Sequence, residues 1–127
     1  MTDPTSTPHF PGRAPIDAYG NGGFRFAEMS HRGSILALPS GMHAWDISSP
    51  AQFSRTAFAP VFAEGPEIEM LLIGTGADPA PLTEDLRWLF REARIGVDAM
   101  TTAAAARTYN ILLAENRRVA AALVAVG

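Results

Sequence analysis

The hydrophobic positions of this chain change their spacing about halfway along it. Between residues 24 and 46, short apolar runs are separated by two stretches rich in turn-forming residues, at 30–33 and 39–41. Apolar runs of this length with such turns between them are typical of β-hairpins. The pattern therefore predicts an antiparallel meander with strands at residues 24–29, 34–38 and 42–45.

Segments of strand length and of helix length alternate in the second half. A short helix near residues 55–63, limited by Pro60, is expected first. Residues 68–73 then form an apolar run of strand length, and Thr83 stands where an N-cap residue would begin a helix. The apolar positions that follow helical spacing are Leu82, Leu86, Leu89, Phe90 and Ala93. This spacing predicts an amphipathic helix with one buried face.

Two more strands and a second long helix complete the unit. Residues 95–100 have the composition of a strand, and Thr101 caps an Ala-rich helix that runs to about residue 114. A last strand is expected at residues 119–126, although its alanines suit a helix equally well. The predicted fold class is therefore α+β, an antiparallel meander followed by a β-α-β-α-β unit whose strands pair in parallel.

The composition fits one folded domain and excludes several kinds of chemistry. The chain has 127 residues, 47% of them hydrophobic, and a chain of this size forms one core. It has no cysteine, and all ten of its cationic residues are arginine. Thiolate nucleophiles, thiolate metal sites, disulfides, Schiff bases and P-loop lysines are therefore excluded. A net charge of -3 offers no basic field for nucleic acid.

Proline content separates the N-terminal segment from the rest. Four of the ten prolines lie in residues 1–15, so a flexible tail is expected there and a single globular domain over residues 16–127. The first residues lack the basic and then apolar order of a secretory signal. The longest apolar run, at residues 119–126, is shorter than the roughly 20 residues of a membrane helix. These features predict a cytoplasmic location.

Five segments of the chain together resemble a known family. They are residues 19–26, 72–76, 95–97, 100–102 and 106–118, the last reading Ala-Arg-Thr-Tyr-Asn-Ile-Leu-Leu-Ala-Glu-Asn-Arg-Arg. In this order they resemble the family that includes the mitochondrial complex I assembly factor 3 and its bacterial relatives. The resemblance implies a compact three-layer domain that combines a β-sheet with an α/β unit. It also favours a strand for the last segment.

The resemblance implies a role rather than a reaction. It implies no enzymatic activity, and it implies assistance in the assembly of the respiratory NADH dehydrogenase together with a partner factor. By this analogy the partner is a respiratory-complex assembly factor or subunit. The protein would then be peripheral at the inner membrane through that partner. This expectation rests on family and fold, not on a catalytic site.

The first candidate site is a glycine-rich turn after the first strand of the unit. Gly74, Thr75 and Gly76 stand where open α/β sheets bind ligands. A dinucleotide-binding turn would have a third glycine where this chain has a proline, so that motif is incomplete. Two interpretations remain. The glycines serve a tight turn, or exposed amides and the Thr75 hydroxyl hold a small anion near Thr101 and Thr102.

The second candidate is the polar strip of the Ala-rich helix. Arg107 and Asn110 lie three positions apart on it, whereas Tyr109 lies on the apolar stripe and is expected in the core. Arg107 would clamp an anionic group or pair with a carboxylate such as Asp98. Alternatively, both polar residues belong to a hydrogen-bond network that holds the helix to the sheet.

The third candidate is a tryptophan on the wrong face of its helix. Trp88 lies about opposite Leu86 on a helical wheel, away from the core stripe. Either a neighbouring segment, such as the tail or residues 50–65, covers the ring, or Trp88 anchors a partner protein together with Arg91. Tryptophan and arginine are enriched at the centres of protein interfaces.

Two constellations are rejected on the sequence. The three histidines, His9, His31 and His43, lie in the tail, in an expected hairpin turn and on a strand, so no metal site is expected. Ser40, His43 and Asp46 supply the residue types of a catalytic triad. Strand alternation would direct Ser40 and His43 to opposite faces, and no nucleophile elbow is present.

The sequence thus leads to two functional hypotheses. The first is a non-enzymatic protein-interaction or assembly module without a cofactor, in line with the resemblance. The alternative is a small anionic-ligand binding protein or weak enzyme with a pocket near Gly74, Thr75 and Gly76. No nucleic acid partner and no membrane span are expected, and the oligomeric state stays open.

Overall fold

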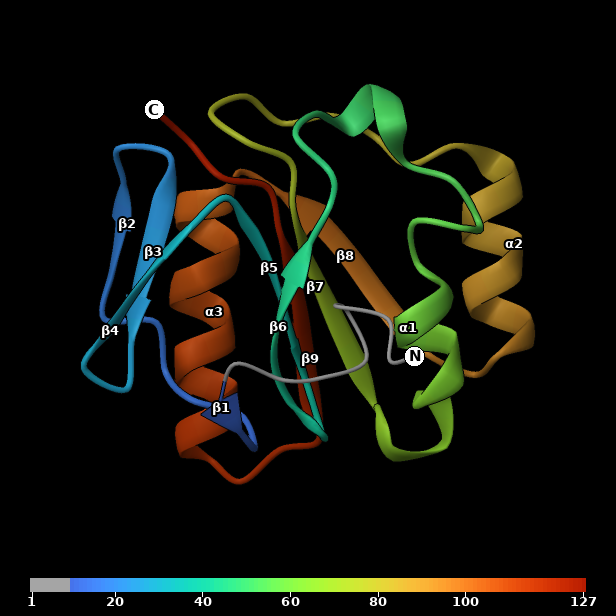
Figure 1. Ribbon diagram of the computed structural model, residues 1–127. Coiled ribbons are helices and arrows are strands. Elements are labelled where there is room, and N and C mark those ends of the chain that lie inside the picture. The colour runs from blue at the N-terminus through green and yellow to red at the C-terminus, as the bar shows by residue number, and fades with distance from the viewer. Residues whose placement is uncertain (1–9) are drawn as a thin grey trace, which may run out of the picture.

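The computed structural model describes residues 10–127, which form three layers around a mixed six-stranded sheet (Figure 1). Two helices cover one face of this sheet, and one helix with a small three-stranded sheet covers the other. The elements are β1 (Phe10–Pro11), β2 (Ala18–Gly20), β3 (Gly23–Phe26), β4 (Met29–Arg32), β5 (Ser34–Leu38), β6 (Gly41–Trp45), α1 (Ala59–Ala63), β7 (Met70–Gly74), α2 (Glu84–Glu92), β8 (Gly96–Met100), α3 (Thr102–Ala114) and β9 (Val119–Leu123). Single 3₁₀ turns lie at Pro50–Gln52 and Gly65–Glu67.

The large sheet contains the predicted β-α-β-α-β unit. Its strand order is β1-β6-β5-β9-β7-β8, and β7 pairs in parallel with both β8 and β9. The predicted fold class, α+β, is confirmed, and so is the strand at the end of the unit. All five residues of β9 are buried between two neighbouring strands, which explains why small alanines are tolerated in a strand here.

The predicted meander is divided between two sheets. Only its last two strands pair as expected, with Ile35 opposite Ala44. The first strand belongs to the three-stranded sheet β2-β3-β4, and the residues expected to form a turn at 30–33 mostly belong to β4. The hairpin turn lies earlier, at Ala27 and Glu28, which both have a positive φ. Neither is glycine, so the sequence carried no signal for a turn at this place.

Aromatic side chains fill the space between the large sheet and the helices α1 and α2. The ring of Phe58 packs edge-on against that of Phe90, with 5.3 Å between the ring centres. The Trp45 indole N–H donates to the Ala57 carbonyl at 2.8 Å. The expected helix at 55–63 is present only from Ala59, because Pro60 is accommodated in the first turn. This aromatic cluster fixes α1 and α2 on one face of the sheet.

The helix α3 and the small sheet cover the opposite face. Tyr109 is fully buried there, and its hydroxyl donates to the Ala14 carbonyl at 2.9 Å. Burial raises the pKa of the Tyr109 phenol above its ordinary range, while the charge of Arg13 acts in the opposite direction. Part of the segment expected as a tail, residues 1–15, thus belongs to the packed domain from Phe10 on. Residues 1–9 lie outside the described part of the chain.

Both long helices begin at the threonines named from the sequence. The Thr83 hydroxyl accepts from the Leu86 amide and the Thr101 hydroxyl accepts from the Ala104 amide, each at 3.3 Å. The helix α3 ends at Ala114, as expected. None of the helices in residues 10–127 has the length and apolarity that crossing a bilayer requires.

Candidate functional site

The outer face of α2 carries an exposed tryptophan. Leu86 and Phe90 anchor the helix in the core, and Trp88 points away from them with 57% of its surface exposed. The guanidinium carbon of Arg91, one turn later, lies 5.7 Å from the centre of the Trp88 ring. At this distance the cation is attracted to the ring face, by about 0.5–1 kcal/mol at an exposed site, which favours this arrangement of the two side chains. In the described part of the chain, residues 50–65 leave most of the ring exposed.

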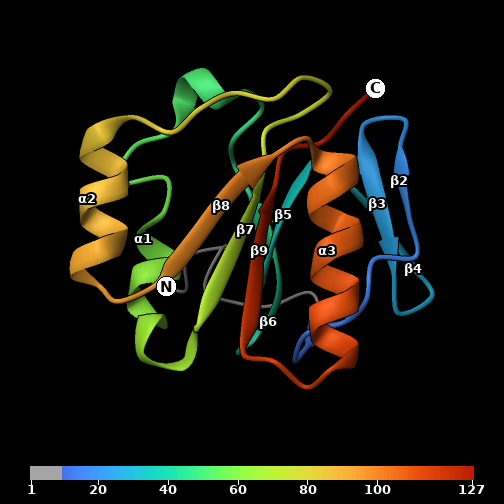
Figure 2. The same cartoon turned by 180° about the vertical axis from the view of Figure 1, so that it is seen from behind.

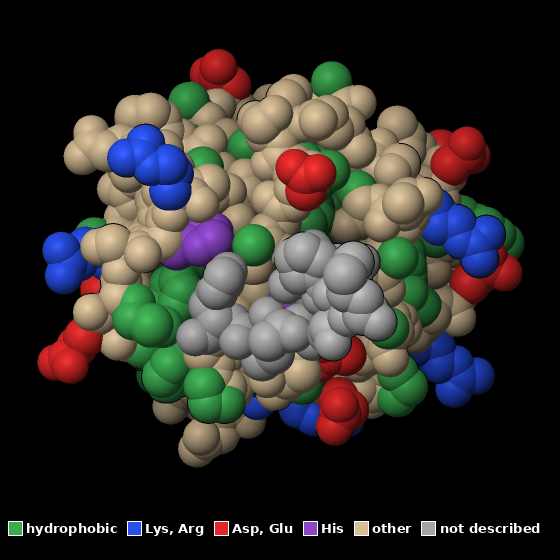
Figure 3. Space-filling model, in the orientation of Figure 1, with side chains coloured by type: hydrophobic (Ala, Val, Ile, Leu, Met, Phe, Trp, Pro, Cys, Tyr) green, Lys and Arg blue, Asp and Glu red, His purple; other side chains and the backbone are tan. Residues whose placement is uncertain are grey.

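A shallow hollow of about 380 Å³ adjoins this ring. Side chains of both charges surround it, and Figure 3 shows basic, acidic and hydrophobic side chains gathered over α2 at that margin of the molecule. The residues that line it are Arg55, Glu84, Asp85, Trp88 and Leu89. We call the hollow together with Arg91 the Trp88 surface. An apolar centre with charged residues around it is the general layout of a protein interface.

The glycine-rich turn after β7 packs tightly against the start of α3. A Cβ atom at Gly74 would lie only 2.8 Å from the Cα atom of Thr102, so only glycine fits. The fully buried Thr102 hydroxyl accepts from the Gly76 amide at 2.9 Å and donates to the Val124 carbonyl at 2.6 Å. The Thr75 hydroxyl reaches the carbonyl of Asp78 at 2.7 Å. The polar groups of this turn therefore have partners inside the protein.

The two polar residues of α3, Arg107 and Asn110, do not contribute to this turn, and their environments differ. The Oδ1 atom of Asn110 accepts a hydrogen bond from the backbone N–H of Ile16, and its Nδ2 atom donates to the Ile16 carbonyl, both at 2.8 Å. Arg107 is exposed on the same helix. The structure thus gathers Gly74 to Gly76 with Thr101 and Thr102, while Asn110 ties the N-terminal segment to α3. Thr75 and Gly76 line a hollow of about 370 Å³ at this end of the sheet.

An ion pair of Arg107 with Asp98, one of the alternatives that the sequence left open, does not form within residues 10–127. The ion pair found there joins Arg117 Nε to Glu69 Oε1 at 3.2 Å, with both side chains about half exposed. The hydrogen bond from Arg117, together with its charge, lowers the pKa of the Glu69 carboxyl. This pair sits at the start of β7, at the opposite end of the strand from the glycine-rich turn.

Ser40 and His43 are in contact, so the expectation that strand alternation directs them to opposite faces was wrong. The Ser40 Oγ lies 2.7 Å from the His43 Nε2, because Ser40 occupies the turn between β5 and β6, where strand alternation does not apply. The carboxylate at this serine is Glu64, which accepts from the Ser40 amide at 2.8 Å and from its hydroxyl at 2.6 Å. A catalytic triad has the histidine between serine and acid. Here the serine is in the middle, and Asp46 lies exposed on the surface.

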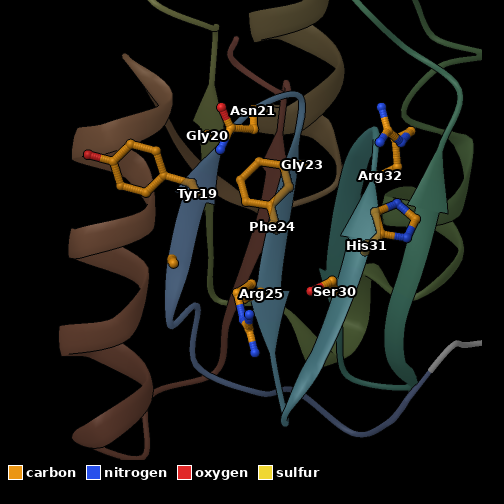
Figure 4. Close-up of a pocket in the computed structure, with 10 residues that line it drawn as sticks. Tyr19, Gly20, Asn21, Gly23, Phe24, Arg25, Ser30, His31 and Arg32 are labelled. Atoms are coloured by element: carbon orange, nitrogen blue, oxygen red, sulfur yellow. The ribbon is translucent and has the colours of Figure 1, made fainter.

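A further hollow, which the sequence did not indicate, lies on the small sheet (Figure 4). It measures about 480 Å³, and all three strands contribute to its lining. Figure 4 shows Arg25 and Arg32 directed toward opposite ends of the sheet, so they do not clamp a single anion. His31, which was expected in a turn, lies in β4 with its Nε2 3.1 Å from the Ser34 carbonyl. Because residues 30–33 were expected to form a turn and not a strand, the sequence did not predict the small sheet or this hollow.

The histidines do not gather with acidic residues into a metal-binding group in the part of the chain that is described. No cluster of three or more potential ligands occurs among those residues. His9 lies outside that part. His31 lies in β4 of the small sheet and His43 in β6 of the large sheet.

Similar proteins are found among both curated sequences and solved structures. An uncharacterized protein of Rhodobacter capsulatus is 40% identical over 120 residues, which covers 92% of this chain and 89% of that protein. The mouse NADH dehydrogenase [ubiquinone] 1 alpha subcomplex assembly factor 3 is 29% identical, and the match covers 91% of this chain and 62% of the mouse protein. The chain thus spans less than two thirds of that relative.

The solved structures agree with these sequence relatives. The crystal structure of an outer membrane protein from Bartonella henselae has a TM-score of 0.90 and 57% identity, and the match covers 94% of this chain and all of that one. The resemblance seen in the sequence is therefore confirmed. The model of the family described as a protein of unknown function (DUF498/DUF598) matches residues 16–124, and the chain belongs to this family.

Proposed function

We propose that this protein is a non-enzymatic interaction module that assists the assembly of a respiratory NADH dehydrogenase, and that it binds its partner through the Trp88 surface. The name of the mouse relative supports the assembly role by analogy. The observation that carries the proposal is the exposed Trp88 ring held under the Arg91 guanidinium. The protein would act in the cytoplasm, peripheral to the inner membrane through its partner.

The physical argument concerns what a partner gains at this surface. Covering a large aromatic ring contributes on the order of 2–3 kcal/mol to a complex. Because Arg91 already favours this arrangement of the ring, less conformational freedom is lost on binding than for a free side chain. The adjacent hollow of about 380 Å³ has room for a side chain from the partner. Its acidic and basic residues would set the orientation of the complex.

The alternative function, binding of a small anionic ligand at Gly74, Thr75 and Gly76, has less support. The hollow at this turn offers space. However, the Gly76 amide is bonded to the Thr102 hydroxyl, and the Thr75 hydroxyl is bonded to backbone carbonyls. A ligand would have to displace these buried bonds, which costs more than binding to free donors.

The test uses a deletion strain complemented with variants of the full chain. Deletion is expected to lower the amount of assembled NADH dehydrogenase on native gels, and Trp88→Ala is expected to restore it only in part. Ile111→Ala is the matched control, because Ile111 is 54% exposed but lies on α3. Unchanged complex in the deletion strain would reject the assembly role. Full rescue by Trp88→Ala would reject this surface while leaving the role intact.

A further inference from the structure

The strand β8 forms an open edge of the large sheet. It pairs with β7 on one side, and no described strand pairs with its other side (Figure 2). The Gly96 amide donates to the Glu69 carbonyl and the Met100 carbonyl accepts from the Thr75 amide, so these peptide groups face β7. Because peptide groups alternate along a strand, those of Val97 and Ala99 face outward.

A hollow of about 540 Å³ runs along this same edge. One wall is the edge itself, residues 97–99, and the other is residues 79–82 with Arg87 of α2. Pro79 and Pro81 have no amide hydrogen, so the opposite wall offers few donors and does not compete with β8 for an incoming chain. The hollow shares no lining residue with the Trp88 surface. It is a separate surface with free backbone groups on one side.

Two charges of opposite sign stand at the two faces of this edge. Val97 and Ala99 pack into the core under α2, so the intervening Asp98 is directed toward the face that α3 covers. Arg87 belongs to α2 and lies on the other face. Both side chains are exposed and line the hollow, and within residues 10–127 neither takes part in an ion pair.

We propose that β8 accepts an extended segment of a partner protein as a seventh strand of the large sheet. The segment would carry a basic residue facing Asp98 and, directly beside it, an acidic residue facing Arg87. Neighbouring residues of a strand point to opposite faces, so one adjacent basic and acidic pair meets both charges at once. Strand addition of this kind draws affinity from main-chain hydrogen bonds and specificity from alternate side chains.

A second copy of this chain fits the edge less well. Antiparallel pairing of two β8 strands over their full length places Asp98 opposite Asp98 of the other copy. Like charges directly opposite each other destabilise a strand pair. An acidic residue in the middle of an edge strand therefore works against self-association and leaves the edge for a partner of complementary charge.

The test titrates the full-length protein with two synthetic peptides and follows its amide resonances. The first is acetyl-Thr-Val-Arg-Glu-Thr-Val-amide, and the control, acetyl-Thr-Val-Arg-Thr-Glu-Val-amide, has the same composition but places Arg and Glu on the same face. The first peptide is expected to shift the amides of Val97 and Ala99 most and to bind about 2- to 5-fold more tightly than the control, the ratio that exposed ion pairs supply. The double variant R87A and D98A is expected to remove that preference.

Ala99→Pro tests the backbone bonds separately. It removes an amide hydrogen that faces outward and not one bonded to β7, so the fold is expected to survive and peptide binding to be lost. The proposal is overturned if both peptides act equally, or if the largest shifts lie away from β8. It is also overturned if sedimentation finds a dimer that Ala99→Pro dissociates, because the edge then serves a second copy. None of these outcomes depends on the assembly role.

Discussion

The hydroxyl of Thr102 is the polar centre of the junction between β7, β9 and α3. It is fully buried, accepts from the Gly76 amide at 2.9 Å and donates to the Val124 carbonyl at 2.6 Å. Thr102→Val keeps the shape of the side chain and removes the hydroxyl. Two buried backbone groups then lose their partner at once, while packing changes little.

The expected loss of stability follows from this count. Each buried polar group left without a partner costs about 1–3 kcal/mol, so the loss of two partners in Thr102→Val should cost about 2–6 kcal/mol. That is a large part of the 5–15 kcal/mol by which a typical domain is stable. Thr102→Ser is the control, because it keeps the hydroxyl and removes one methyl group, at about 1 kcal/mol.

Urea unfolding followed by tryptophan fluorescence measures both variants, since Trp45 is buried in the core. With a urea dependence of about 1–3 kcal/mol per molar, Thr102→Val should lower the midpoint by about 1 M or more without changing the slope. If Thr102→Val unfolds at the same urea concentration as Thr102→Ser, the hydroxyl does not hold this junction and the reasoning is refuted.

Two further predictions concern the face covered by α3. Asn110→Ala removes both hydrogen bonds to Ile16 and should lower the free energy of unfolding by about 1–3 kcal/mol. Limited proteolysis should then cleave the chain near Ile16 faster, and an unchanged cleavage rate there would contradict this prediction. Because burial raises the pKa of Tyr109, the native state holds the phenolic proton more tightly than the unfolded state, which ionises at about pH 10. The free energy of unfolding should therefore fall as pH rises above ~10, and Tyr109→Phe should remove that slope in urea titrations at several pH values.

The helices of this protein were predictable because their signals are local. Thr83 and Thr101 cap the helices that they were expected to cap, and the helical spacing alone placed Trp88 away from the core. Capping and amphipathic spacing act over a few residues, so a single sequence reveals them. The parallel pairing within the β-α-β-α-β unit also followed from the local alternation of strands and helices.

The parts that the sequence did not reveal depend on contacts between distant residues or on unusual backbone. Asn110 meets Ile16 across 94 positions, and Glu64 meets Ser40 across 24. The hydrophobic periodicity of a sequence does not predict contacts between residues so far apart. The turn at Ala27 and Glu28 uses positive φ without glycine, so the small sheet and its hollow were missed. The candidate residues on α3 were found as polar positions, but their bonding partners were not.

The central place of β9 has a consequence for protein synthesis. This strand lies between β5 and β7, yet it is the last strand of the domain to leave the ribosome. Until then β5 with β6 and β7 with β8 are two separate pieces of sheet, each with an exposed apolar edge. We therefore expect the nascent chain to expose these two strand edges until residues 119–123 have been synthesised. The domain closes in one late step, when residues 119–123 enter the gap between the two pieces.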